Sequence, residues 1–110
     1  MIEIIIKKHL EDNLDVPIFL EMQEKMPDSF VIFEKTSGGQ KNLINSATFA
    51  FQSYGDSMYE AAKLNEELKK AIFKLRWSKE VGGVKLNSDY SFTDISTKKY
   101  RYQAVFDISY

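Results

Sequence analysis

The longest regular pattern in the chain runs over residues 46–75, where an alternating stretch is followed by a helical one. Apolar and polar residues alternate over 46–54, which predicts a strand with two unlike faces because successive side chains point to opposite sides of a pleat. After Gly55, apolar residues recur every three or four positions, which predicts an amphipathic helix. Its stripe consists of Ala61, Leu64, Leu68, Ala71, Ile72 and Leu75. Ser57 and Glu60 have the spacing of a capping box at the helix start.

The N-terminal half predicts a second helix and two further strands. A stripe of isoleucine and leucine favours a helix over 2–14. The run 16–20 is apolar but contains Pro17, which cannot donate to a ladder, so it predicts a short edge strand. The run 30–35 is continuously apolar at its start and predicts a central strand. The polar stretch 36–42 predicts a flexible hairpin loop, longer than the tight two-residue kind, before a strand that ends at Tyr54.

The C-terminal third predicts a β-hairpin. The glycines at 82–83 suit a helix C-cap or a turn, because glycine takes positive φ at no steric cost. Apolar runs at 84–86 and 90–95 predict one interrupted strand, and 96–97 a turn. The final stretch 100–110 alternates, which predicts a half-solvated antiparallel strand. Its apolar face comprises Tyr100, Tyr102, Ala104, Phe106, Ile108 and Tyr110.

Taken together, the element order is α-β-β-β-α-β-β, which predicts an α+β fold. Both helices and most strands have one apolar side, so we expect one twisted antiparallel sheet of four to five strands with both helices packed on one face. A length of 110 residues predicts a single domain, 1–110.

Composition narrows the possible functions. With 15 basic and 16 acidic side chains the net charge is -1, whereas binders of duplex nucleic acid usually have a basic excess. The chain has no cysteine, which excludes disulfides and thiolate metal sites. It contains no apolar run of about 20 residues to span a bilayer and no signal-peptide pattern at its start, so we expect no membrane partner and a cytosolic location.

Candidate catalytic groups are few. His9 is the only histidine, and its charged neighbours predict a solvated helix residue rather than a general base. The acidic residues show no pattern of converging ligands, so we expect no metal and no cofactor. The segment 37–41 contains two glycines and a lysine but lacks the GxxxxGK(S/T) spacing of a phosphate loop. A non-enzymatic protein is therefore expected, and an enzyme remains only a residual hypothesis.

Two features suggest contact with other macromolecules. The run 98–102 interleaves cations with tyrosines, as single-strand binders do, but alternation along one strand places the two kinds on opposite faces. The polar face of the strand ending at Tyr54 is small and uncharged at Ser46, Thr48, Ala50 and Gln52. Such a face is either ordinary solvent-exposed surface or a contact with a subunit or partner.

Three segments resemble a known family. FVIFEKTSGGQKN (30–42), ATFAFQSYGDSMYEAAKLNEELKKAI (47–72) and KLNSDYSFTDISTKKYRYQAVFDISY (85–110) resemble small siphophage morphogenesis proteins. These proteins are encoded among the head–tail joining genes of phages and prophages of Gram-positive bacteria, and are often described as minor capsid or tail completion proteins. Helix–sheet order and size are also similar to the tail terminator proteins of long-tailed phages.

The resemblance implies a virion assembly role. A tail terminator forms a homo-oligomeric ring of six copies that caps the tail tube and then meets the head connector. The implied partners are sister copies, the tail tube protein and the connector, with DNA only passing through the ring. The implied locations are the host cytoplasm during assembly and the head–tail junction of the virion. Two alternatives stay open: another minor capsid or connector adaptor protein, and a single-stranded nucleic-acid binding module.

A ring subunit needs head-to-tail contacts that close by rotation, and polar loops and sheet surfaces can supply them. The candidate oligomer or partner interface comprises Ser37, Gly38, Gly39, Gln40, Lys41, Thr48, Gln52, Arg101 and Gln103.

Overall fold

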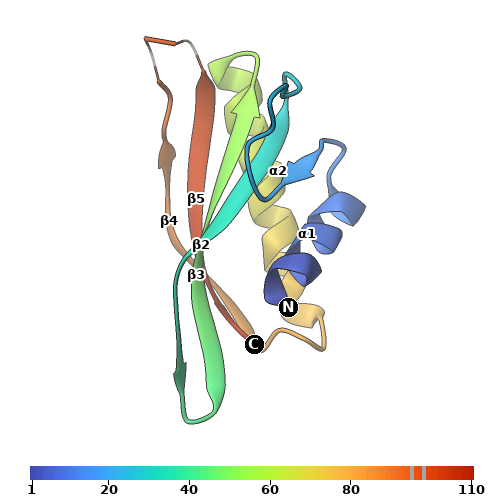
Figure 1. Ribbon diagram of the computed structural model, residues 1–110, viewed down its shortest axis with the longest axis vertical. Coiled ribbons are helices and arrows are strands. Elements are labelled where there is room, and N and C mark those ends of the chain that lie inside the picture. Colours follow the sequence, from blue (N-terminus) through green and yellow to red (C-terminus); the bar gives the residue numbers. More distant parts are fainter. Residues whose placement is uncertain (95, 98) are drawn as a thin grey trace.

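The strands form one five-stranded sheet, and both helices lie against one side of it (Figure 1). The computed structural model describes residues 1–94, 96–97 and 99–110. The elements are α1 (Ile2–Asn13), β1 (Ile18–Phe19), β2 (Phe30–Lys41), β3 (Ile44–Gly55), α2 (Met58–Phe73), the 3-10 helix η1 (Lys74–Trp77), β4 (Gly83–Ser91) and β5 (Tyr100–Ser109). The predicted α+β class and the order α-β-β-β-α-β-β are confirmed.

The sheet is mixed rather than wholly antiparallel. Its strand order is β1-β2-β3-β5-β4, and the pairs β2–β3, β3–β5 and β4–β5 are antiparallel as predicted. Strand β1 instead runs parallel to β2, with Ile18 opposite Val31. The reason lies in the connection 20–29, which carries the chain back along the sheet as parallel pairing requires, where a hairpin turn would have given the opposite direction.

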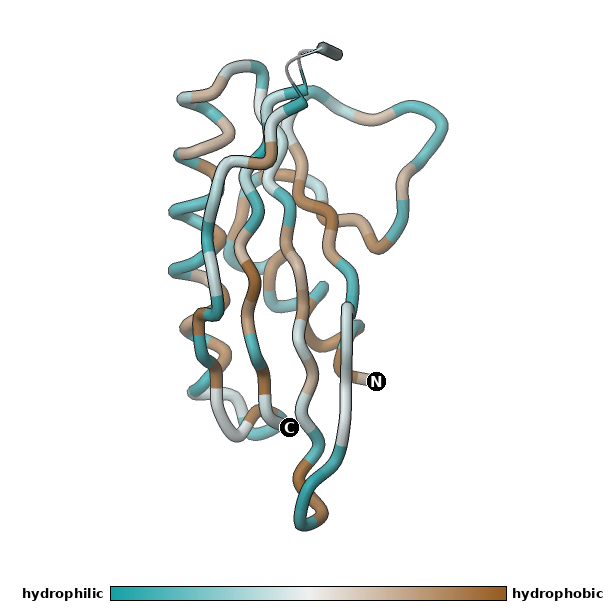
Figure 2. Tube along the Cα trace, turned by 90° about the vertical axis from the view of Figure 1, so that its left-hand side faces the viewer, coloured by the Kyte–Doolittle hydropathy of each residue, from teal (hydrophilic) through white to brown (hydrophobic). Residues whose placement is uncertain are grey.

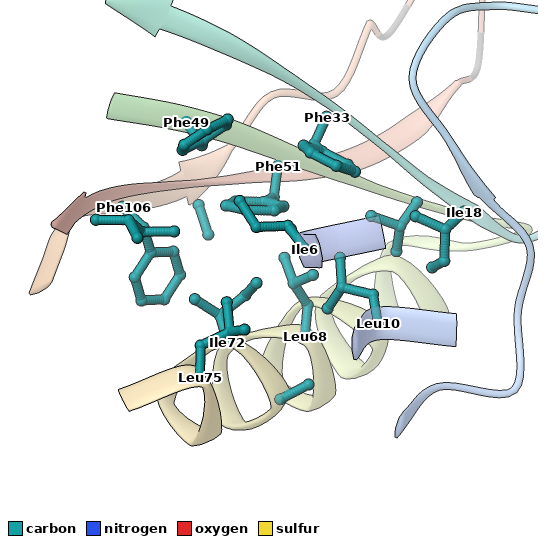
Figure 3. Close-up of a cluster of buried hydrophobic side chains, with 14 of the residues drawn as sticks. Ile6, Leu10, Ile18, Phe33, Phe49, Phe51, Leu68, Ile72, Leu75 and Phe106 are labelled. Carbon is teal, nitrogen blue, oxygen red and sulfur yellow. The ribbon is translucent and has the colours of Figure 1, made fainter. Parts of the chain in front are cut away.

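The core lies between the helices and the inner face of the sheet (Figure 3). The predicted helical stripe is buried from Ala61 to Leu75, although its last residue, Leu75, lies in η1 rather than in α2. Phenylalanine rings from three strands meet it, with the ring centroids of Phe33 and Phe51 5.2 Å apart and those of Phe51 and Phe106 5.9 Å apart. Fully buried side chains of large volume include Phe33, Phe49, Phe51, Phe106, Ile6, Leu10, Leu68, Ile72 and Leu75.

The junction between β3 and α2 is tight. Ser57 is the N-cap residue of α2, and its Oγ accepts a hydrogen bond from the Glu60 N–H at 3.1 Å, as the capping pattern predicts. A Cβ built on Gly55 would lie 2.6 Å from the backbone nitrogen of Ala61. Only glycine leaves room for the helix to start so close to the strand end.

The region after α2 differs from the prediction in two places. The glycines at 82–83 are neither a helix cap nor a positive-φ turn: the Gly82 N–H donates to the Ser109 carbonyl at 2.7 Å, and Gly83 begins β4. Strand β4 also continues through the predicted break, because the register shift at Asn87 absorbs one residue as a bulge. It ends at Ser91, and Ile95 lies outside the described residues.

The prediction of a flexible loop over 36–42 is wrong. Strand β2 continues to Lys41, and β3 begins at Ile44, so that Asn42 and Leu43 alone form the turn. Both have positive φ, 52° and 66°, which is the combination that a two-residue hairpin of type I′ requires. A bulge at Thr36, between the pairs of Lys35 and Ser37, lets the strand absorb an irregular stretch. Pairing with β3 therefore outweighs the weak strand preference of glycine and polar residues.

None of the described helices is long and apolar enough to cross a membrane.

Candidate functional site: the hairpin arm and the uncovered sheet face

The β2–β3 hairpin extends beyond the helices as a two-stranded arm, defined here as residues 36–46. Every residue of the arm is exposed to solvent. The arm forms the lower end of the molecule in Figure 1, and the extents of 45 × 25 × 24 Å show how far it lengthens one axis. Ser37, Gly38, Gly39, Gln40 and Lys41, the first five predicted interface residues, all lie in its β2 half. A two-stranded ribbon without a covering layer gains little stability from its own contacts.

The tip of the arm is apolar. Leu43 is 89% exposed and Ile44 is 58% exposed, and Figure 2 shows the brown of hydrophobic residues at the lower end of the chain. Leu43 also has a positive φ, a region where Cβ crowds the backbone and where glycine is the usual hairpin residue. The turn therefore holds a large apolar side chain in water at a steric cost.

The other four predicted interface residues lie on the face of the sheet that α1 and α2 leave uncovered, called the uncovered face below. They are linked to one another or to neighbouring strands by side-chain hydrogen bonds. Thr48 Oγ1 donates to Asp107 Oδ1 at 2.6 Å, and Gln52 Nε2 donates to Gln103 Oε1 at 2.9 Å. Gln103 in turn donates to the Tyr90 hydroxyl. These bonds span β3, β5 and β4 and give the uncovered face a fixed polar surface.

Arg101 is the centre of an aromatic cluster on this face. Its guanidinium donates to the Tyr54 hydroxyl at 2.9 Å and to the Phe92 carbonyl at 2.6 Å, and its Cζ lies 4.4 Å from the centre of the Phe92 ring. The prediction that cations and rings fall on opposite faces holds along β5 but not across the sheet. The rings come from Tyr54 of β3 and from Phe92, which directly follows β4. Lys98, part of the same predicted run, lies outside the described residues.

The segment 20–29 crosses the upper part of the uncovered face. Together with β2 and β3 it encloses an open cavity of 290 Å³. The cavity is lined by Leu20, Glu21, Met22, Ile32, Phe33, Glu34, Ala50 and Gln52. Ala50, predicted as part of an uncharged outward surface, is buried here. Segment 20–29 therefore covers a part of the sheet face that was predicted to contact either solvent or a partner.

The predicted interface residues thus form two groups that meet at the base of the arm. A shallow hollow of 160 Å³ includes Ser37 and Gly39 from the arm and Thr48 from the uncovered face. The tip residues Leu43 and Ile44 were not among the predicted interface residues. The signal that could have found them is Asn42, an αL-tolerant residue between two stretches able to pair.

His9 is half-buried rather than solvated as predicted. Its Nε2 lies 2.6 Å from the Ala71 carbonyl oxygen of α2, so that this nitrogen carries the proton and donates. The bond ties α1 to α2. Among the described residues, no group of three metal-ligating side chains converges at this place or elsewhere.

A second polar cluster joins α2 to β4. Buried Asn65 donates to Asp89 Oδ1 at 2.7 Å, and the Lys69 ammonium contacts both Asp89 and Glu66. Partial burial lowers the pKa of Lys69, but its hydrogen bonds to Asp89 and Glu66 together outweigh this, and the pKa lies above its ordinary value. The cluster fixes the register between helix and strand, so we assign it to stability.

No protein-family model matches this chain, and no curated protein matches it at a significant level.

Proposed function

We propose that this protein is a non-enzymatic subunit of the head–tail junction of a long-tailed phage, a tail-terminator-like protein that closes the tail tube as a ring of identical copies. The observation that carries the proposal is the arm, a hairpin with an exposed apolar tip and no covering layer. The resemblance of three segments to siphophage morphogenesis proteins supports a role in virion assembly.

A ring subunit needs two different surfaces, one for each neighbour, because its contacts are head-to-tail. The arm and the uncovered face are two such surfaces on one chain. The arm is slender and the uncovered face is largely polar, so each single contact buries little apolar area. We therefore expect weak or absent self-association at micromolar concentration, and rings at high concentration or on the end of a tail tube.

Deleting the gene from the phage or prophage that encodes it tests the proposal by electron microscopy of the particles. Tails of uncontrolled length would support the terminator role. Tails of normal length that fail to join heads would favour a connector adaptor instead. Normal virions in normal numbers would contradict both roles.

Binding to purified tail tubes gives a second measurement. We expect the purified protein to decorate tube ends as rings, visible by negative-stain microscopy, and to leave tube sides bare. A monodisperse protein that never joins tubes would contradict the proposal.

A second candidate function is favoured by one observation, the cation–aromatic cluster of Arg101, Tyr54 and Phe92 on the uncovered face. Such clusters bind single-stranded nucleic acid by stacking and phosphate contact. Fluorescence anisotropy with labelled oligonucleotides at low salt tests it. Binding that weakens with salt and is lost in Arg101→Ala would support this function, and no binding at low ionic strength would remove it.

A further inference from the structure

We propose that the apolar tip of the arm docks into the cavity beneath segment 20–29 of a second copy of this chain. This inference rests on the proposed function in one respect: it supplies the contact by which identical copies would form the ring.

The tip has the properties of an inserting group. Leu43 belongs to the turn of the arm and Ile44 is the first residue of β3 after it, and both side chains are exposed. The arm itself forms one end of the longest axis of the molecule (Figure 1). Glycine after Asn42 would make a less strained turn, as the positive φ of Leu43 indicates. The apolar side chain is therefore better explained by a contact outside the chain than by the stability of the hairpin.

The cavity has the properties of a receiving site. Two of its lining residues, Leu20 and Met22, are 39% and 50% exposed, and Ile32 and Ala50 supply an apolar floor. Its volume of 290 Å³ is close to the lower end of ligand pockets, about 300 Å³, which leaves room for aliphatic side chains. Methionine adapts its shape to an incoming group more readily than branched residues do.

Charge is complementary between the two surfaces. Lys41 pairs with Ile44 across the turn, so both side chains lie on the same side of the ribbon. The cavity lining contains two carboxylates, Glu21 and Glu34. An arm seated in the cavity would bring the Lys41 ammonium to this acidic rim, which favours this orientation over a reversed one.

The two surfaces cannot meet within one chain. The tip is at the lower end of Figure 1, whereas segment 20–29 lies near the upper end, and Figure 2 shows the same separation from the side. A tip seated in the cavity of the next copy, with that copy's tip in the cavity of a third, makes a heterologous contact, which repeats until it closes a ring or extends as a filament. The occupant of the cavity is therefore a second copy.

Disulfide trapping tests the contact directly, because the chain contains no cysteine. Leu43→Cys protein is mixed with Met22→Cys protein at several hundred micromolar under mild oxidation. The matched control pairs Leu43→Cys with Tyr59→Cys, which is exposed at the start of α2. We expect the tip–cavity pair to give at least tenfold more mixed dimer than the control pair. Equal yields, or tip–tip dimers alone, would overturn the proposal.

The double variant Leu43→Cys/Met22→Cys tests the head-to-tail arrangement. We expect a ladder of covalent trimers and higher oligomers. Dimers alone would indicate that two copies exchange arms reciprocally and would refute the repeating contact.

Leu43→Gly separates assembly from folding. We expect the melting temperature to stay or rise, because glycine suits the turn, while self-association measured by sedimentation weakens at least tenfold. Ile4→Gln, which removes an exposed isoleucine from α1, is the control and should leave association unchanged. Association that Leu43→Gly leaves intact would contradict the proposal.

The contact and the proposed function can fail independently. Rings on tail tubes without tip–cavity crosslinks would keep the function and refute this contact. Crosslinks in solution together with normal virions from the deletion strain would keep the contact and refute the function. A thiol-linked photo-crosslinker on Leu43→Cys that captures the tail tube protein rather than a second copy of this chain would show a different occupant and also refute the contact.

Discussion

At the scale of single residues, two positions of the chain are under unusual steric constraint. Gly55 lies against the first turn of α2, and Leu43 holds a backbone region that leucine rarely adopts. At Gly55, any side chain would clash with α2. At Leu43, the backbone strain lowers the stability of the turn, which indicates that this leucine serves function rather than stability.

Replacing Gly55 with alanine should destabilise the protein. The new Cβ would be 2.6 Å from the Ala61 nitrogen and 2.9 Å from the Glu60 carbonyl carbon, and backbone atoms cannot move aside without shifting α2. We expect a loss of about 1–3 kcal/mol in the free energy of unfolding, measured by urea denaturation. Gly39→Ala is the control, since a Cβ at that position would have no neighbouring atom within 4 Å and the φ of Gly39 is not positive. Equal stability of the two variants would contradict the steric explanation.

At the scale of elements, the helices and the sheet are joined by a few polar contacts in addition to the core. The Asn65–Asp89–Lys69 cluster joins α2 to β4, and His9 joins α1 to α2. These contacts set how the layers sit on one another. They connect residues 20 or more positions apart, so that tertiary packing alone creates them.

Removing the Asp89 carboxylate should weaken the α2–β4 contact. Asp89→Ala leaves the buried Asn65 amide without its acceptor and the Lys69 ammonium with Glu66 as its one remaining ion-pair partner. An orphaned buried donor costs about 1–3 kcal/mol. Denaturation of Asp89→Ala beside Asp12→Ala, a change at an exposed carboxylate of α1, measures the difference. A loss no greater than that of the control would show that the cluster contributes little.

The pH dependence of this contact follows from the raised pKa of Lys69. A raised folded-state pKa stabilises the fold fully below the unfolded value, about 10.4, and this stabilisation is lost as the pH rises through the folded value. The stability difference between the natural chain and Lys69→Met should therefore stay constant from about pH 6 to pH 9 and shrink in stronger alkali. Denaturation across this range checks it, and a difference that falls near neutral pH would contradict the assignment.

The arm should open more readily than the rest of the sheet. The arm residues between Ser46 and the tip pair only within the hairpin and, at Asn45, with the Tyr110 backbone. The β3 residues Phe49 and Phe51 are instead buried and paired with a strand on each side. Hydrogen exchange should therefore be fast for amides in the outer arm and slow for those in the middle of β3. Similar protection in both regions would show that the arm is stabilised by contacts other than its own ladder.

At the scale of the whole molecule, the chain divides into a packed body and a thin projection. The body contains every buried phenylalanine, and the arm contains none of the core. An arrangement of this kind separates folding from assembly, because changes at the tip leave the core intact.

Assembly should change the arm and spare the body. On tail tubes, or in concentrated protein, we expect slower hydrogen exchange at the tip of the arm and in segment 20–29, with the centre of β3 unchanged. Protection elsewhere with an unaltered tip would place the subunit contact on another surface.

The body could largely be predicted from the sequence. The stripe of α2 and the alternation of β5 correctly predicted the buried faces, because period alone decides which side chains share a side. The predicted strand 30–35 contains all the buried residues of β2. The exposed half was predicted as loop, since Gly38 and Gly39 have low strand propensity and only pairing with β3 overrides it.

The candidate site was predictable in part. Thr48, Gln52, Arg101 and Gln103 were correctly placed on one face by alternation, but their partners come from other strands. No local pattern brings Phe92 to Arg101 or Met22 over Ala50. The predicted solvation of His9 failed for the same reason: its bond partner lies 62 residues away.

By itself, the sequence determined the element order, the faces of α2, β3 and β5, and the absence of cysteine chemistry, because periodicity and composition are local properties of the chain. Tertiary structure alone decided the parallel direction of β1, the continuation of β2 into an arm, and the cavity beneath segment 20–29. These depend on pairings and contacts between distant residues, whose free energy outweighs local preference only once the sheet has formed.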